Sequence, residues 1–374
     1  MKIAYIGQKG IPATFGGVDF HVEELSKRIV QREHKVYVYV RNWYTDRNLR
    51  EYQGVKLIHT STMRTKHLDT FMHSLTSSLH SIFQDYDIIH YHALGPTIFS
   101  WLPKFLRSKV VVTVHGLDWQ RGKWGRFAKA FLKFTERTAT YVPNKTIVVS
   151  KAQKEYFESK YGRECIYIPN GVNIPQAKPT SGIVKEKYDL NGEDYLLWMG
   201  RLTPEKRVDW LIKVFREIKT KMPTLRLVIA GGSSATDEYV RGLEKLAGDD
   251  ERIIFTGYVA GQEKEELFSN ALLFVLPSYL EGLPIALLEA MSYRLPCLAS
   301  DIPPHKEVIS EGVDGFLFQS NNFSNFVEKL KDLLRNSNGR KYIGENAKRK
   351  VKREYNWDKV VRKTEEVYEE VLKS

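Results

Sequence analysis

Short apolar and β-branched runs alternate along the chain with segments whose apolar positions follow a helical period. In the first half, the runs that we expect to form strands are Lys2–Ile6, Lys35–Val40, Val55–His59, Asp87–Tyr91, Lys109–Val114 and Thr146–Val149. Between the first two runs, four apolar residues step by four, three and four: Val18, Val22, Leu25 and Ile29. This spacing places them on one side of a helix and predicts a strand–helix–strand unit with parallel strands.

A second series of strand-like runs comprises Tyr195–Met199, Leu225–Ala230, Arg252–Phe255, Leu272–Leu276 and Pro296–Ala299. The two series predict an α/β protein with two doubly wound, Rossmann-like parallel-sheet domains that face a central cleft. The stretch from Pro175 to Asp194 contains two prolines and two glycines and has no apolar period. We therefore expect an N-terminal domain over 1–175, a linker over 176–194 and a C-terminal domain over 195–355. A last helix over 356–374 is expected to fold back onto the first domain.

The length of 374 residues suits two domains, and 42% hydrophobic with 27% charged residues indicates ordered protein. The longest apolar runs, such as Val110–Val114, are too short to cross a bilayer, and Met1–Gly7 lacks the features of a signal peptide. We therefore expect a cytoplasmic protein. Cys165 and Cys297 lie far apart in the sequence, which disfavours both a disulfide framework and a cysteine metal site.

The formal net charge of +12 favours anionic partners, namely nucleotides, phosphorylated lipids, acidic membranes or nucleic acid. The sequence contains no zinc-finger spacing, recognition helix or RNA-binding signature. Nucleic acid is therefore not an expected partner.

Two carboxylates frame a predicted helix start in the segment that follows Pro277. Glu281 precedes Pro284, which suits a first helical turn, and Glu289 lies about two turns inside the helix. The amides around Gly282 and Leu283 can face an anion or sugar hydroxyls, and a carboxylate can accept two hydroxyl hydrogens of a diol. The simpler interpretation is an acidic N-terminal residue and a solvated helical glutamate.

Two cations follow the first strand of the second domain. Arg201 and Lys206 could stabilise the negative charge that grows on a departing nucleoside diphosphate without the help of a metal. The simpler interpretation is an exposed basic helix start.

Together these segments resemble the donor-site signature of the retaining glycosyltransferases of family 4, which have the two-domain GT-B fold. The resemblance rests on Glu281 and Glu289 with their flanking Pro277-Ser278 and Ala290-Met291, and on Gly200-Arg201-Leu202 followed by Pro204-Glu205-Lys206. It implies that Glu281 contacts the transferred sugar and Glu289 the nucleotide ribose. Two positions depart from the family pattern: Arg207 replaces a common glycine, and Pro303-Pro304 stand where a glycine pair is frequent.

The first domain contributes Gly16-Gly17 in the loop after the first strand, where glycines permit close approach to a phosphate and a simple turn is the other interpretation. The stretch from Ile6 to Arg28 resembles a subgroup that includes bacterial rhamnosyltransferases of polysaccharide assembly. His115 follows a predicted strand, and the resemblance places it by the donor sugar. Asp118 is a weaker candidate on the acceptor side.

Two further patterns could suggest a metal site. His90 and His92 alternate along a strand, and Asp85-Tyr86-Asp87 mimics the metal-binding Asp-x-Asp of another glycosyltransferase fold. Because Arg201 and Lys206 can do the work of a metal, we expect no metal and no cofactor.

A basic amphipathic segment lies between Arg121 and Thr138. Its aromatic residues are spaced like one side of a helix and alternate with cations: Trp124, Phe127, Phe131 and Phe134 with Arg126, Lys129 and Lys133. The segment predicts either peripheral contact with an anionic membrane or an aromatic stripe packed on the domain core.

These features predict a metal-independent glycosyltransferase of the hexosyltransferase type, and the resemblance to family 4 implies that it retains the anomeric configuration. Its donor would be a nucleotide-sugar, and its acceptor a glycan or a polyprenyl-diphosphate-linked oligosaccharide in cell-surface polysaccharide biosynthesis. A nucleotide-sugar epimerase or a glycogen-type synthase of the same fold is one alternative. A non-catalytic sugar-nucleotide binding protein is an alternative of another class.

Overall fold

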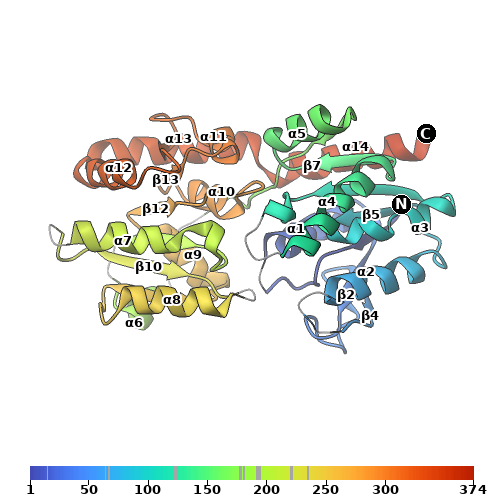
Figure 1. Ribbon diagram of the computed structural model, residues 1–374, viewed down its shortest axis with the longest axis horizontal. Coiled ribbons are helices and arrows are strands. Elements are labelled where there is room, and N and C mark those ends of the chain that lie inside the picture. The colour runs from blue at the N-terminus through green and yellow to red at the C-terminus, as the bar shows by residue number, and fades with distance from the viewer. Residues whose placement is uncertain are drawn as a thin grey trace. The chain divides into compact units, whose positions relative to one another are not determined.

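The computed structural model describes residues 1–14, 16–63, 65, 68–120, 125–176, 179, 182–190, 195–219, 222–233 and 236–374. The chain forms two compact units. The first unit comprises Met1–Gly171 together with Trp357–Ser374, and the second comprises Val172–Asn356. Figure 1 colours both units by residue number.

The first unit is built on an eight-stranded sheet with the order β3-β4-β2-β1-β5-β6-β7-β8. Its strands are β1 (Lys2–Ile6), β2 (Lys35–Arg41), β3 (Glu51–Tyr52), β4 (Val55–Thr60), β5 (Ile88–His92), β6 (Lys109–Val114), β7 (Lys145–Val148) and β8 (Ile166–Tyr167). All neighbours pair in parallel except β3 and β4, which are antiparallel. The carboxyl ends of the parallel strands therefore share one edge.

The helices of this unit cover both faces of the sheet. They are α1 (Gly17–Gln31), α2 (Leu68–Ser81), η1 (Gly95–Phe99), α3 (Trp101–Phe105), η2 (Asp118–Gln120), α4 (Arg126–Tyr141), α5 (Lys151–Tyr161) and α14 (Trp357–Lys373). Alternate residues of β1 point to opposite faces because successive side chains of a strand alternate. Tyr5 packs with Leu25 and Tyr368, whereas Ala4 belongs to the cluster that contains Ala139 and Phe157.

The second unit is built on a six-stranded sheet, parallel throughout, with the order β11-β10-β9-β12-β13-β14. Its strands are β9 (Tyr195–Met199), β10 (Arg226–Ala230), β11 (Ile253–Gly257), β12 (Leu273–Leu276), β13 (Cys297–Ser300) and β14 (Phe316–Phe318). Its helices are α6 (Ile183–Tyr188), η3 (Pro204–Lys206), α7 (Val208–Ile218), α8 (Asp237–Ala247), α9 (Gly261–Asn270), α10 (Ile285–Ser292), α11 (Pro303–Val308), α12 (Phe323–Arg335) and α13 (Ser337–Glu354). Every residue of β9, β12 and β13 is buried, as expected of central strands covered by helices on both faces.

The strands expected from the sequence are present with ends shifted by at most two residues, and β3, β8 and β14 are additional. The division between units falls at Gly171 and Val172, earlier than the expected linker over 176–194. That stretch contains α6, whose buried Val184 donates its backbone N–H to Glu266 Oε2 on α9 at 2.9 Å. In Figure 1, α14 lies in red among the blue and green elements of the first unit.

A helix that crosses a bilayer needs about 20 consecutive, mostly apolar residues. Among the described residues, no helix is both long enough and apolar enough to cross a bilayer.

Candidate active site

The residues expected to carry the chemistry follow the carboxyl ends of strands in both units. In the second unit, Arg201 and Lys206 follow β9, and Glu281 follows β12. In the first unit, Gly16 lies in the loop after β1, and His115 follows β6 directly. Ligands of parallel α/β sheets bind at this edge, where loops and helix starts converge.

Lys206 and Glu281 form a buried ion pair. The distance from Lys206 Nζ to Glu281 Oε1 is 2.5 Å, and the side chains are 15% and 8% exposed. Burial alone would raise the pKa of the Glu281 carboxyl, but the charge of Lys206, with a smaller effect of His305, holds that pKa below its usual value. Glu281 is therefore ionised at neutral pH.

Glu289 lies on α10 and has a lysine partner of its own. Lys264 on α9 donates from Nζ to Glu289 Oε1 at 2.5 Å, and the two side chains are 26% and 14% exposed. The two glutamates singled out in the sequence thus both carry an ammonium partner. Lys264 was not predicted from the sequence.

The loop after β9 is bound to the loop after β10. Gly200 N–H donates to Ala230 O, and Leu202 N–H donates to Gly232 O, both at 3.0 Å. A Cβ atom on Gly231 would lie 1.8 Å from Gly200 O, and Gly231 has a φ of +144°, so only glycine fits there. This close packing fixes the path of the backbone on both sides of Arg201, which is half-buried.

Arg207, which replaces the glycine common in the family, adopts left-handed backbone angles of φ 50° and ψ 41°. Its guanidinium lies 4.3 Å from the ring centroid of Trp210 and 5.0 Å from that of Tyr279. It also donates to Ser320 O at 2.7 Å and to Asn321 Oδ1 at 2.9 Å. These contacts offset the steric cost of a left-handed conformation that a glycine would adopt freely.

The second departure from the family pattern lies at the start of α11, where Pro303 and Pro304 occupy the first positions. Prolines carry no N–H, so this helix start offers a ligand fewer donors than a glycine pair would. The next residue, His305, is fully buried and donates from Nδ1 to Ser300 O at 2.8 Å. Burial lowers the pKa of His305 to about 4, although the charge of Glu281 opposes that shift.

The segment around Gly282, Leu283 and Pro284 forms the start of α10. Pro284 is the N-cap residue and the helix begins at Ile285, one residue later than a proline in the first turn would require. Gly282 is half-buried and Leu283 is 5% exposed. The expected helix start is thus present beside Glu281.

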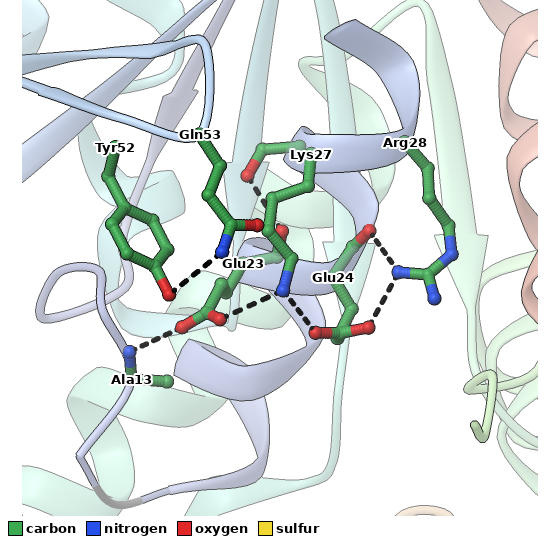
Figure 2. A network of polar contacts seen from close by, with 8 residues as sticks. Ala13, Glu23, Glu24, Lys27, Arg28, Tyr52 and Gln53 are labelled. Carbon is green, nitrogen blue, oxygen red and sulfur yellow. Dashed lines mark hydrogen bonds and ion pairs between the residues drawn. The ribbon is translucent and has the colours of Figure 1, made fainter. Parts of the chain in front are cut away.

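The loop after β1 is clamped onto α1 by two carboxylates. Lys9 N–H donates to Asp19 Oδ1 at 2.6 Å. Ala13 N–H donates to Glu23 Oε2, also at 2.6 Å (Figure 2). Gly16 is the N-cap of α1 with a φ of +105°, and Gly17 is the first helical residue. These two amides of the loop are therefore already paired within the protein. Phe15, within the same loop, lies outside the described residues.

An ion-pair network on α1 holds the clamp in place (Figure 2). Lys27 Nζ contacts Glu23 Oε1 at 3.0 Å and Glu24 Oε1 at 2.6 Å, and Arg28 Nη1 contacts Glu24 Oε2 at 2.6 Å. Burial favours the neutral form of Glu24, but Lys27 and Arg28 together hold its pKa below the usual value. The network fixes Glu23 against Ala13 and so stabilises the loop.

His115 belongs to a cluster of histidines. Its Nε2 lies 3.1 Å from Nδ1 of His92, and its ring meets that of His21 edge-on with centroids 4.7 Å apart. Burial holds the pKa of His92 and of His115 well below the usual histidine value. One nitrogen of each of these three residues lies within 4.8 Å of the others, although His92 and His115 are hydrogen-bonded to each other.

Asp118 begins η2 and is half-buried, and the neighbouring Trp119 anchors this turn to α4. Trp119 Nε1 donates to Glu136 Oε1. Glu136 is fully buried and also accepts from Lys160 Nζ at 2.8 Å and from Tyr161 OH at 2.7 Å. The turn that carries Asp118 is therefore firmly held.

Asp85 and Asp87 lie at the amino end of β5, at the opposite edge of the sheet from the candidate site. Asp85 Oδ2 pairs with Lys2 Nζ at 3.0 Å, and Asp87 Oδ2 accepts Lys2 N–H at 2.6 Å. These carboxylates connect two strands of the sheet. Asp85 and Asp87 therefore share the sequence pattern of a metal-binding Asp-x-Asp, but both carboxylates contact Lys2.

Two family models match the chain. The model described as "Glycosyltransferase Family 4" matches residues 15–176, and that described as "Glycosyl transferases group 1" matches residues 183–350. An uncharacterized glycosyltransferase of Methanocaldococcus jannaschii is 27% identical over 396 residues, which cover 98% of each chain. The UDP-Gal:alpha-D-GlcNAc-diphosphoundecaprenol alpha-1,3-galactosyltransferase of Escherichia coli is 28% identical over 258 residues, 66% of each chain.

Among solved structures, Anabaena HepE in complex with UDP-glucose superposes with a TM-score of 0.83 at 18% identity. The match covers 99% of this chain and 100% of that one. Two parallel-sheet α/β units of this kind define the GT-B fold class of glycosyltransferases. Since the two family models together span most of the sequence, the chain belongs to glycosyltransferase family 4.

Proposed function

We propose that this glycosyltransferase takes a sugar from a nucleotide-sugar and transfers it, with retention of anomeric configuration, to a glycan or polyprenyl-diphosphate-linked acceptor. The observation that carries the proposal is the pair of lysine–glutamate contacts at one edge of the second sheet, Lys206–Glu281 and Lys264–Glu289. Both carboxylates are held ready to accept hydroxyl hydrogens, and the ammonium groups are placed to meet phosphate charge.

Glu281 contacts the transferred sugar in this proposal, and Glu289 the ribose. The bond between the anomeric carbon and the diphosphate oxygen breaks, and its electron pair goes to the phosphate. Arg201 and Lys206 stabilise that charge, so the transfer requires no metal. The acceptor oxygen then bonds to the same face of the anomeric carbon, and its proton goes to the departing phosphate.

Relatives and solved neighbours support the choice of donor and acceptor class. The galactosyltransferase of Escherichia coli is named for a UDP-sugar donor and a diphosphoundecaprenol-linked acceptor, and HepE was solved with UDP-glucose. By analogy, the chain acts in assembly of a cell-surface polysaccharide, with its first unit holding the acceptor near His115 and Asp118. The loop of Gly16 and Gly17 contributes to phosphate binding.

Peripheral contact with an anionic membrane is the second part of the proposal. Phe127, Phe131 and Phe134 on α4 are 94%, 38% and 53% exposed, whereas the face that packs inward is formed by Leu132, Thr135, Glu136, Ala139 and Thr140. Arg126 and Lys133 are exposed among the aromatic rings. Exposed aromatics beside cations suit the headgroup region of anionic lipid. Trp124 lies outside the described residues.

The donor site is tested by thermal shift with UDP, GDP, ADP and dTDP, with and without EDTA, on the wild type and Glu289→Ala. A ligand that binds only the folded state increases the free energy of unfolding, by about 2.7 kcal/mol when its concentration is a hundred times its Kd. The melting temperature rises as a result. We expect one nucleotide to stabilise the wild type with or without EDTA and to have little effect on the variant.

The nucleotide identified in this way selects the sugar donors to be tested for transfer. The anomeric configuration of the product, determined by NMR, then tests retention. Absence of stabilisation by all four nucleotides at millimolar concentration would contradict the donor site, and an inverted product would contradict the retaining mechanism.

A further inference from the structure

His115 and His92 form a hydrogen-bonded pair whose proton arrangement can be derived from the surrounding contacts. We infer that His92 fixes His115 in the tautomer protonated on Nδ1, which makes His115 a hydrogen-bond donor to a substrate oxygen and prevents it from acting as a base. This inference rests on the proposed function only where it assigns that oxygen to a substrate. The tautomers of His92 and His115 follow from contacts within the protein and do not depend on which substrate binds.

The two rings lie almost parallel, with centroids 5.4 Å apart and an interplanar angle of 29°. His92 Nδ1 and His115 Nε2 are 3.1 Å apart, so one of them carries the shared proton and the other accepts it. Because burial keeps the pKa of both rings well below the usual value, each ring has a single proton at neutral pH. Two arrangements are therefore open, and they differ in which nitrogen of His92 is protonated.

The other nitrogen of His92 decides between them. His92 is fully buried, and its Nε2 has no hydrogen-bond partner among the residues that the structure describes. An orphaned N–H in a protein interior is rarer than an orphaned acceptor, since the unpaired donor loses its hydrogen bond to water outright. The proton of His92 is thus on Nδ1 and is donated to His115 Nε2. His115 must then carry its own proton on Nδ1.

The neighbours of His92 fix the plane of its ring, and the contact of Nδ1 with His115 sets which way round the ring lies. Its ring stacks on that of His90 at 4.3 Å and meets the ring of Tyr5 edge-on at 5.2 Å. His90 is itself held at both nitrogens, by Tyr368 OH and by Thr113 Oγ1, each at 2.7 Å. His92 is therefore a positioning residue that acts through His115.

His115 presents the opposite nitrogen to a ligand. Its ring is half-buried, and in the described part of the chain no protein group is hydrogen-bonded to Nδ1. An Nδ1–H can donate to a sugar hydroxyl oxygen or to an oxygen of the departing diphosphate. It cannot remove the proton of the acceptor, because the lone pair of Nε2 is already used by His92. This agrees with the proposed transfer of the acceptor proton to the departing phosphate.

The inference is tested by ¹⁵N NMR of histidine side chains in the full-length protein, which distinguishes the two neutral tautomers. In the wild type we expect the His115 signal of the Nδ1–H form. In His92→Phe, which keeps a ring of similar shape, His115 should become a mixture of tautomers, and kcat should fall at least tenfold. The melting-temperature shift given by the bound nucleotide should not change.

His90→Phe is the matched control, because it alters an equally buried ring on the same strand but leaves the His92–His115 contact intact. It should retain the Nδ1–H signal of His115 whatever stability it loses. His115→Asn, whose amide nitrogen stands near the position of Nδ1, should retain more activity than His115→Gln, whose amide stands near Nε2. A wild-type His115 in the Nε2–H form would overturn the inference, even if the nucleotide site is confirmed.

Discussion

Glu281 keeps its negative charge in a place where burial opposes that charge. The carboxyl is ionised because the charge and hydrogen bond of Lys206, which lies 2.5 Å away, together with weaker effects of other neighbours such as His305, lower its pKa more than burial raises it. The charge of one residue thus depends on the presence of the other.

Replacing Lys206 by methionine should therefore change how activity depends on pH. Without the ammonium group, burial dominates and the pKa of Glu281 rises, so the carboxylate becomes protonated at a higher pH as the solution is acidified. We expect kcat/KM to fall about 100-fold and the acidic limb of its pH profile to move to higher pH. Kinetics across pH 4–8 measure both effects, with Lys264→Met as the control that leaves Glu281 paired. An unmoved acidic limb would contradict the dependence of Glu281 on Lys206.

Arg207 carries a backbone cost that its side chain offsets. Alanine at this position keeps the cost of the left-handed conformation and loses the contacts with Trp210, Tyr279 and Ser320. Glycine loses the same contacts without that cost. Arg207→Ala should hence be less stable than Arg207→Gly by about 1 kcal/mol, the scale of a left-handed penalty. Urea unfolding of both variants measures the difference, and equal midpoints would show that the backbone cost is absent.

The sequence could single out Glu281, Glu289, Arg201 and Lys206 as candidates because they lie after strand ends within short, recognisable segments. It could not identify Lys264 or His92 as partners of site residues. Lys264 meets Glu289 across a separation of 25 residues, and His92 meets His115 across 23. Such contacts depend on how two helices or two strands are packed, which local spacing does not reveal.

At the scale of elements, the buried strands were predictable because a central parallel strand is a continuous apolar run bounded by turns. Three strands were not predicted. β3 and β8 are two residues long and β14 is three residues long. A run of that length has no measurable period, and its pairing is decided by the strand that it lies beside.

Helix α4 is the element on which the membrane proposal depends. Phe127→Ser combined with Phe134→Ser removes two exposed rings without disturbing the buried face. Binding to liposomes that contain anionic lipid should fall at least tenfold, as measured by flotation, because each buried aromatic ring contributes to partitioning. Phe105→Ser, at a ring that is 81% exposed on α3, is the matched control. Equal loss in the control would assign lipid binding to another face, and no loss in either would remove the membrane part of the proposal.

At the scale of the whole molecule, the buried histidines of the first unit make the stability of the protein depend on pH. Burial lowers the pKa of His21 to about 4 and those of His73 and His90 to about 3, whereas the same residues titrate near 6.5 when unfolded. Between those values the unfolded chain binds protons that the folded chain does not. The contribution of these neutral rings is therefore complete above pH 6.5 and is lost as the pH falls toward their folded pKa values.

We expect the first unit to lose up to about 1.4 kcal/mol of stability per pH unit for each such histidine between pH 6.5 and 4. His73 is the best position for a test, since neither of its ring nitrogens has a hydrogen-bond partner among the described residues. His73→Phe should reduce the slope of the free energy of unfolding against pH by the contribution of one histidine, up to about 1.4 kcal/mol per pH unit. The free energy of unfolding at pH 7 should change little. Thermal unfolding at several pH values measures the slope, and parallel curves for variant and wild type would contradict the linkage.

The placement of α14 determines the order in which the molecule can be completed as it is made. Trp357, Val361 and Tyr368 belong to the core of the first unit, but they follow the whole second unit in the sequence. A ribosome therefore releases Val172–Asn356, which can fold as a unit, while the sheet formed by the earlier residues still lacks one of its covering helices. The part of the protein that is synthesised first is the last to close its core, and its apolar face needs protection throughout that interval.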